Sequence, residues 1–188
     1  MEKERVILGI DPGTNILGYS IIEQRGKQSQ LLKMDVLVLG TKDDLSTKMK
    51  KLFDQITEII DIFKPDILAI EAPFFGKNVQ SMLKLGRAQG ICIAAAFSRS
   101  IPFVEYSPRK IKQSITGNGA ASKEQVANML QRMFNFEAIP SYLDATDALA
   151  VAVCHSYQKE ELMASSSSVK KTSSKKTSWA SFISQNPD

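Results

Sequence analysis

Two apolar segments of this chain each end in an acidic residue. Residues 6–10 (VILGI) lead directly into Asp11, and residues 67–70 (ILAI) lead directly into Glu71. Apolar runs of this length are typical of buried strands, and acidic residues are rarely buried without a partner. If the two strands are parallel neighbours, Asp11 and Glu71 share one edge of a sheet.

Hydrophobic spacing along the rest of the chain predicts an α/β fold. Gly26 marks a turn between two early strands, and Lys64-Pro65 ends the first helix. Two later helices carry N-terminal signals, Ser107-Pro108 and Ser122 with Gln125. The hairpin-type start followed by crossovers predicts a five-stranded mixed sheet flanked by helices. The predicted strands are 6–10, 17–22, 36–39, 67–70 and 103–106, and the predicted helices are 45–63, 79–97, one starting at 108, one starting after 122, and 141–159.

Two more acids, Asp144 and Asp147, begin the last predicted helix. Residues three apart share a helix face, so this helix, packed across the same sheet edge, would complete a four-carboxylate cluster with Asp11 and Glu71. Each acid except Glu71 also has a structural explanation. Asp11 suits the turn of its Asp-Pro-Gly sequence, Asp144 suits a cap formed with Ser141, and Asp147 complements the helix dipole.

The cluster predicts a metal centre of hard oxygen ligands. Four carboxylates at close range do not all stay charged without a cation, and Mg²⁺ prefers such oxygen ligands. Softer ligands are poorly placed. Cys92 and Cys154 lie in apolar helical runs and are expected to be reduced core thiols. His155 lies 11 residues beyond Asp144, about 16 Å along the helix axis, and is expected to be a helix-end residue.

Length and charge suggest one domain with a tail. The chain has 188 residues, close to the usual size of a single domain. We expect residues 1–160 to form that domain and 161–188, a Ser/Lys-rich segment, to be disordered. Residues 164–188 contain four of the 24 basic residues and only one of the 20 acids. Most of the net charge of +4 therefore belongs to the tail. The chain has neither a secretory signal pattern nor an apolar run long enough for a bilayer, which predicts a cytoplasmic protein without membrane association.

Four segments together resemble the RuvC-type Holliday junction resolvases, or crossover junction endodeoxyribonucleases, over about residues 5–157. These segments are 9–14 (GIDPGT), 69–71 (AIE), 84–90 (KLGRAQG) and 144–150 (DATDALA). The resemblance implies a ribonuclease H-like fold, a homodimer, and cleavage of two opposed strands of a four-way DNA junction in recombination and repair. It also implies a branch-migration helicase complex as a partner.

The resemblance assigns the catalytic and metal-binding roles to Asp11, Glu71, Asp144 and Asp147. Two Mg²⁺ ions per active site, for which Mn²⁺ could substitute, would support phosphodiester hydrolysis that leaves 5′-phosphate and 3′-hydroxyl ends. Asp11 is the expected bridge between the two ions.

Four other residues are predicted to contact DNA. Phe74 and Lys77 follow Glu71 closely, and an aromatic ring there could stack on an unpaired base; alternatively, the ring pins its loop to the core. Lys112 and Lys123 flank residues 117–119 (GNG) and match lysines that the family uses near its active site. Lysines of this kind also occur on ordinary solvated surfaces.

The resemblance places the dimer interface on the helix that carries Gly86 and Gly90, whose small size permits close approach of another backbone. Packing of this helix on its own sheet would explain the same glycines.

Three other functions share some of these sequence features with the resolvases. Sugar kinases and actin-like ATPases also open with a strand and Asp-x-Gly, but they need a duplicated domain for which this chain has no room. A ribonuclease H-like enzyme acting on RNA–DNA hybrid would use the same metal site. A junction-binding module without catalysis would not need all four acids.

Overall fold

The computed structural model describes residues 4–40, 42–73 and 78–158. Residues Met1–Tyr157 form one compact unit. The predicted disordered tail, 161–188, lies outside the described residues, so its disorder and the domain boundary remain predictions. The strands are β1 (Glu4–Asp11), β2 (Ile16–Arg25), β3 (Gln28–Val38), β4 (Ile67–Glu71) and β5 (Phe103–Tyr106), and the helices are α1 (Leu45–Phe63), α2 (Val79–Phe97), α3 (Pro108–Thr116), α4 (Lys123–Phe134) and α5 (Leu143–Ser156).

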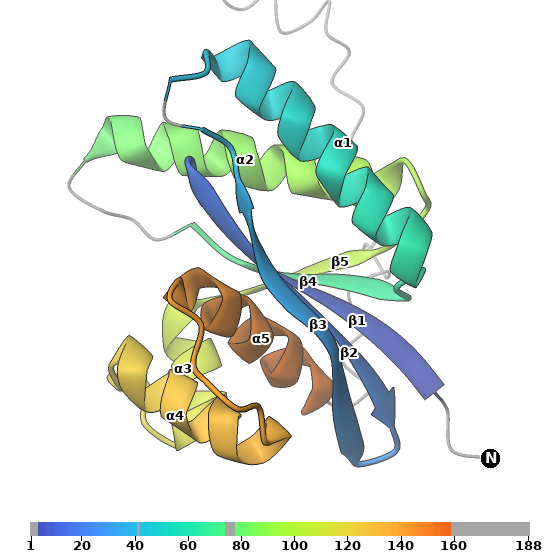
Figure 1. Cartoon of the computed structure of the whole chain (residues 1–188), viewed down its shortest axis with the longest axis vertical. Helices are drawn as coiled ribbons and strands as arrows, with labels where there is room; N and C mark the ends of the chain where they lie inside the picture. The colour runs from blue at the N-terminus through green and yellow to red at the C-terminus, as the bar shows by residue number, and fades with distance from the viewer. Residues whose placement is uncertain (1–3, 41, 74–77, 159–188) are drawn as a thin grey trace, which may run out of the picture. The chain divides into compact units, whose positions relative to one another are not determined.

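The strands form one mixed five-stranded sheet in the order β3-β2-β1-β4-β5. The first three strands pair antiparallel as a meander, whereas β4 pairs parallel to β1 and β5 pairs parallel to β4. The predicted fold class and the mixed sheet are therefore confirmed. Helices cover both faces: α1 and α2 lie on one face, and α3, α4 and α5 lie on the other (Figure 1).

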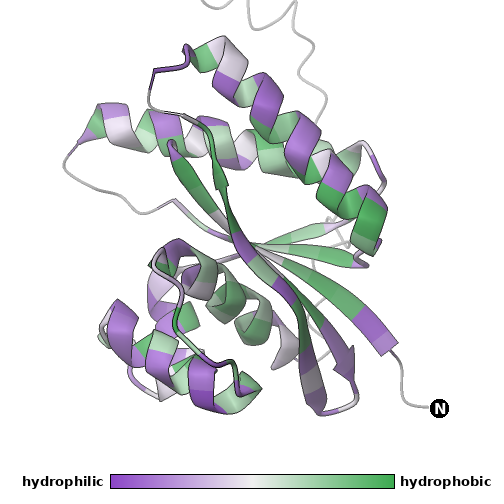
Figure 2. Ribbon diagram, in the orientation of Figure 1, coloured by the Kyte–Doolittle hydropathy of each residue, from purple (hydrophilic) through white to green (hydrophobic). Residues whose placement is uncertain are grey.

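The alternation of side chains along β1 divides the core between the two faces. Leu8 and Ile10 belong to a buried cluster with Leu52 and Ile56 of α1 and Cys92 of α2. The intervening positions of β1 therefore face α5. That helix is largely hydrophobic where it crosses the sheet (Figure 2), and it is buried from its third residue to its end except at Asp147.

Local signals account for the starts of three helices. Asp44 caps α1, where its side chain accepts a hydrogen bond from the backbone N–H of Thr47. Ser107 caps α3, and Ser122 forms a capping box with Gln125 at the start of α4, as predicted.

Two predicted elements were wrong in extent. The third strand was predicted over 36–39, but β3 begins at Gln28, because its first part, residues 28–35, is half-buried to exposed and lacks a long apolar run. The last helix was predicted over 141–159 with Ser141 as its cap. Instead, α5 has Tyr142 at its N-cap position with no side-chain capping hydrogen bond, and it ends at Ser156.

In the described part of the chain, no helix is both long and apolar enough to cross a membrane. Cys92 and Cys154 are buried and form no disulfide, as predicted. Burial raises the pKa of the Cys92 thiol to about 12, so both position and protonation agree with a core thiol.

Candidate active site

Asp11 and Glu71 end two neighbouring parallel strands, as expected. Ile10 of β1 is paired with Ile70 of β4, and each acid is the next residue of its strand. Because side chains alternate, Asp11 shares the face of Gly9, which is the face covered by α5. The sheet therefore presents both carboxylates at one edge, next to the last helix.

Small residues on the sheet let α5 approach closely enough to add its own acids. A Cβ at Gly9 would lie 2.8 Å from the Cβ of Ala152, and a Cβ at Gly18 would overlap the carbonyl oxygen of Asp144. The hydroxyl of Ser20 donates a 3.0 Å hydrogen bond to a carbonyl oxygen of α5. These contacts fix the first turn of α5 against the strand ends. These small residues were not predicted from the sequence, although Gly18 and Ser20 occupy alternate positions on one face of β2.

The result is a small hollow of about 150 Å³ that contains three of the four predicted acids and two of the three predicted lysines. Asp11 comes from β1, Glu71 from β4, Asp147 from α5, Lys112 from α3 and Lys123 from α4. The remaining lining is mainly apolar and consists of Pro108, Ile111, Val126 and Ala150. Five elements thus converge on one charged hollow with partly apolar walls.

Lys123 is the direct partner of Asp147. Its ammonium group donates a hydrogen bond to a carboxylate oxygen of Asp147 and forms an ion pair with it. The Asp147 side chain is only 14% exposed, whereas that of Lys123 is 53% exposed. The pair joins α4 to α5 at the mouth of the hollow and compensates part of the charge there.

Burial and mutual repulsion raise the pKa values of these acids. Burial, followed by the charges of Glu71 and Asp147, raises the pKa of Asp11 well above its ordinary value. Burial, with the charge of Asp147 as the second cause, raises the pKa of Glu71 to about 7. The pKa of Asp147 is also raised by burial, although Lys123 opposes the shift. Burial lowers the pKa of Lys123, but its hydrogen bond to Asp147 and the acidic charges outweigh burial and raise it overall.

Asp144 lies one turn before Asp147 on α5 and does not line the hollow. Its charge nevertheless contributes to the raised pKa values of Asp11 and Asp147. Within residues 4–40, 42–73 and 78–158, no three acidic, histidine or cysteine side chains stand close enough together to hold a metal ion. The repulsion among the carboxylates and their oxygen chemistry still fit a hard divalent cation. The metal-binding role of the four acids remains a prediction.

The other predicted site residues fall in two groups. Lys112 and Lys123 are brought to the carboxylates, whereas Phe74 and Lys77 lie outside the described residues. His155 is in the last turn of α5, where its Nδ1 atom lies 2.7 Å from the hydroxyl of Tyr106. Burial, followed by the charge of Arg5, lowers the pKa of His155 to about 4. His155 is therefore a buried helix-end residue.

Comparison with known proteins decides the family. The model of the family described as crossover junction endodeoxyribonuclease RuvC matches residues 7–155, which include all four predicted acids. The chain belongs to the RuvC family. The RuvC protein of Cytophaga hutchinsonii is 54% identical over 185 residues, covering 98% of this chain and 88% of that protein. The RuvC protein of Christiangramia forsetii is 51% identical over 187 residues, covering 100% of this chain and 93% of that protein.

A solved RuvC structure agrees with the fold. RuvC of T. thermophilus, in complex with a Holliday junction substrate, superposes with a TM-score of 0.76 at 30% sequence identity, covering 81% of this chain and 93% of that one. The five-stranded mixed sheet described above is thus the ribonuclease H-like sheet of a RuvC protein, as the sequence resemblance implied.

Proposed function

We propose that this protein is a structure-specific endonuclease that resolves four-way (Holliday) DNA junctions by hydrolysing phosphodiester bonds on two opposed strands. The observation that carries the proposal is the hollow in which Asp11, Glu71 and Asp147 meet Lys112 and Lys123. Family membership supports the substrate, because a RuvC relative of the same fold has been solved with a Holliday junction.

Asp11, Glu71, Asp144 and Asp147 are the proposed ligands of two Mg²⁺ ions, with Mn²⁺ as a possible substitute. Bound ions of this kind activate the attacking water and neutralise charge on the leaving 3′ oxygen, which leaves 5′-phosphate and 3′-hydroxyl ends. The support from this chain is its donor chemistry: burial, together with repulsion from neighbouring carboxylates, raises the pKa values of Asp11 and Glu71. A cation relieves that repulsion.

The two lysines supply the positive charge that a phosphate needs. Lys123 contacts Asp147 directly and opposes the rise that burial causes in the pKa of Asp147, and Lys112 adds a second cation to the wall of the same hollow. We propose that both lysines face the scissile phosphate when substrate binds, because ammonium groups beside a phosphodiester stabilise the charge that develops on it during hydrolysis.

Phe74 and Lys77 are the proposed contacts to the open centre of the junction. They follow the end of β4 at Glu71 by three and six residues in the sequence. A ring that stacks on an unpaired base contributes about 1–3 kcal/mol per base. Phe74 is therefore assigned to base stacking and Lys77 to a neighbouring phosphate.

A homodimer is supported by an unpartnered stripe along α2. Val79, Leu83 and Phe97 expose 64%, 58% and 59% of their surface. Gly86 and Gly90 lie at helical spacing between them, and a Cβ at either glycine would meet nothing within 4 Å among the residues that the structure describes. The alternative in which these glycines pack on their own sheet is therefore not supported. A second copy on this stripe would give two active sites related by a twofold axis, matching two equivalent strands of a junction.

The cellular setting rests on family membership alone. We propose that the enzyme works in DNA recombination and repair in the cytoplasm, together with a branch-migration helicase complex. Neither assignment depends on the geometry of the site.

The test compares substrates. A labelled immobile four-way junction, a linear duplex of the same sequence and an RNA–DNA hybrid are incubated with Mg²⁺ or with chelator. Paired symmetric nicks in the junction alone, and only with Mg²⁺, are expected. Cleavage of the hybrid instead would make the protein a ribonuclease H-like enzyme with the same site, and binding without cleavage would make it a junction-binding module.

A further inference from the structure

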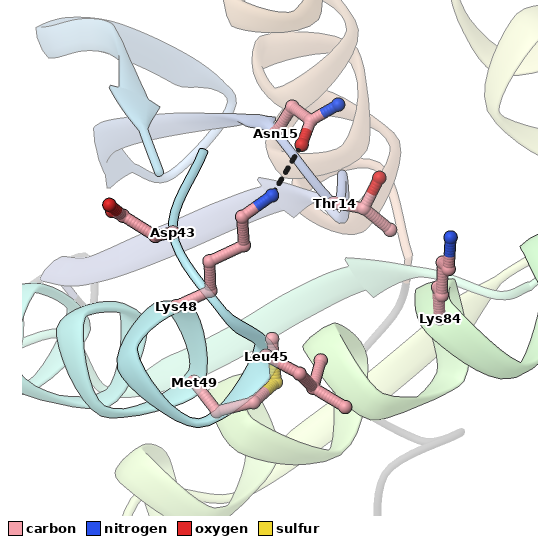
Figure 3. Close-up of a pocket in the computed structure, with 7 residues that line it drawn as sticks. All are labelled: Thr14, Asn15, Asp43, Leu45, Lys48, Met49 and Lys84. Atoms are coloured by element: carbon pink, nitrogen blue, oxygen red, sulfur yellow. Dashed lines mark hydrogen bonds between the residues drawn. The ribbon is translucent and has the colours of Figure 1, made fainter. Parts of the chain in front are cut away.

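A second hollow, of about 260 Å³, lies at the turn between β1 and β2 on the side of α1 and α2. Thr14 and Asn15 of that turn form one wall, Lys48 of α1 forms another, and Lys84 of α2 lies opposite (Figure 3). Thr14 follows Asp11 by only three residues, so their Cα atoms are at most about 11 Å apart. The hollow is therefore close to the proposed cleavage centre but separate from it.

Lys48 is positioned by the turn itself. Its ammonium group donates a 2.8 Å hydrogen bond to the side-chain oxygen of Asn15, as Figure 3 shows. The backbone carbonyl of Asn15 accepts a 2.8 Å hydrogen bond from the N–H of Leu39, which anchors the turn. An uncharged partner leaves the positive charge of Lys48 uncompensated, so this lysine is oriented without being neutralised.

The net charge of the hollow is positive. Across the residues that the structure describes, Lys84 has no acidic partner within ion-pair distance. Asp43 lies on the rim, but its carboxylate is 3.4 Å from the ammonium group of Lys51 and points away from Lys84 in Figure 3. Two lysines from different helices therefore face one space, and the acid among its lining residues, Asp43, is paired with Lys51.

The floor of the hollow is apolar. Leu45, which is 43% exposed, and Met49 line it below the lysines. An apolar floor under two cations suits a ligand that carries a phosphate and a less polar group together. A nucleotide unit of a nucleic-acid strand has this character, because its sugar or base can contact the floor while its phosphate meets the lysines.

We propose that this hollow binds a backbone phosphate of the cleaved strand, at a linkage a short distance from the scissile one. Lys48 and Lys84 contact the phosphate, and Leu45 and Met49 contact the attached sugar or base. The inference rests on the proposed nuclease function. With Lys112 and Lys123 on the α5 side of the sheet, it places cations on both flanks of the carboxylates, so the strand is held before and after the bond that is cut.

The test replaces single phosphates of the junction by neutral methylphosphonates, one linkage at a time, and measures binding in chelator. The wild-type protein should bind the modified junction several-fold more weakly than the unmodified junction when the methylphosphonate replaces one particular linkage beside the cut site. The variant Lys48→Gln with Lys84→Gln should lose that sensitivity. It should also reduce the slope of log affinity against log salt by roughly 0.7–0.9 for each hollow that loses its phosphate contact.

Matched variants separate this role from folding. Lys50→Gln lies on the same helix, where Lys50 is 77% exposed and paired with Asp54, and it should keep both the linkage sensitivity and the slope. Lys84→Gln alone breaks no hydrogen bond found among the described residues and should lose part of the sensitivity. An unchanged linkage profile and slope in the double variant would overturn the inference.

The outcome also separates the inference from the proposed function. If the wild-type protein cuts the junction but the double variant shows the wild-type profile, only the inference fails. If the wild-type protein binds through a linkage that depends on Lys48 and Lys84 but never cuts, only the proposed function fails. Absence of any binding would overturn both.

Discussion

Gly18 of β2 lies directly beneath the backbone carbonyl of Asp144 in α5, with no room for a Cβ between them. The carboxylate of Asp144 and the hollow beside it therefore depend on a contact between backbones. Packing of a helix onto a sheet usually leaves space for side chains from both. Here the absence of a side chain at position 18 sets how close α5 comes to the strand ends.

Gly18→Ala should accordingly disturb both stability and the site. The added methyl group must displace α5, which is expected to reduce the free energy of unfolding by about 1–3 kcal/mol and to reduce cleavage by more than the unfolded fraction explains. Urea denaturation and single-turnover cleavage measure the two effects. Gly86→Ala is the matched control for stability, because among the described residues a Cβ there meets nothing within 4 Å. Since Gly86 lies on the proposed dimer stripe, unfolding of the two variants is compared at a concentration where light scattering shows monomers. Equal stability of both variants would contradict the close contact.

The strand and helix pattern was largely predictable because local signals specify it. The periodic apolar residues predicted the full extents of α1 and α2, and Ser107 and Ser122 predicted the starts of two further helices. Where local signals are weak, prediction failed. Gln28 begins an edge strand whose first part, residues 28–35, lacks a long apolar run, and Ser141 has capping chemistry but is not at the helix start.

The site was predictable only in part, for a similar reason. Asp11 and Glu71 could be placed together because strand ends of parallel neighbours meet at one edge. The pairing of Lys123 with Asp147, and the contact of Gly18 with Asp144, join residues that are far apart in the sequence. Such pairs depend on the final packing of α4 and α5, which no local pattern encodes.

The raised pKa values of the acids predict that metal binding depends on pH. Glu71, with a pKa of about 7, holds a proton over part of the neutral range that a cation must displace, and the raised pKa of Asp11 acts in the same direction. Affinity for Mg²⁺ or Mn²⁺ should therefore rise with pH and be roughly tenfold or more weaker at pH 6 than at pH 8. Isothermal titration calorimetry in buffers of different ionisation enthalpy measures the affinity and the protons released. A flat pH profile with no proton release would contradict the arrangement.

The stripe on α2 predicts a dimer that one charge disrupts. Leu83→Glu places a carboxylate among exposed apolar residues, so it should convert the dimer to a monomer in light scattering after size-exclusion chromatography. Met129→Glu on α4 is the control, because Met129 is also exposed, at 45%, but lies outside the stripe. A monomeric wild-type protein, or a Leu83→Glu dimer of unchanged affinity, would rule out this interface.

His155 predicts a loss of stability in acid. Its pKa falls from an ordinary value of 6.5 to about 4 in the folded protein, so between these pH values the unfolded chain binds a proton that the folded chain does not. Stability is thus fully present above pH 6.5 and declines towards pH 4, by about 3 kcal/mol for this group. Urea denaturation from pH 7 to pH 4.5 should show a smaller decline for His155→Asn than for the wild type. Parallel curves would exclude His155 as the cause.

The most direct test of the central claim, that the carboxylates at the ends of β1 and β4 and the start of α5 form the cleavage centre, is single-turnover cleavage of a labelled four-way junction by Asp11→Asn. Asp54→Asn, which alters an exposed acid paired with Lys50, is the control. We predict that Asp11→Asn binds the junction with nearly wild-type affinity but does not cut it, while Asp54→Asn does both. Cleavage by Asp11→Asn at the wild-type rate would contradict the assignment of the active site.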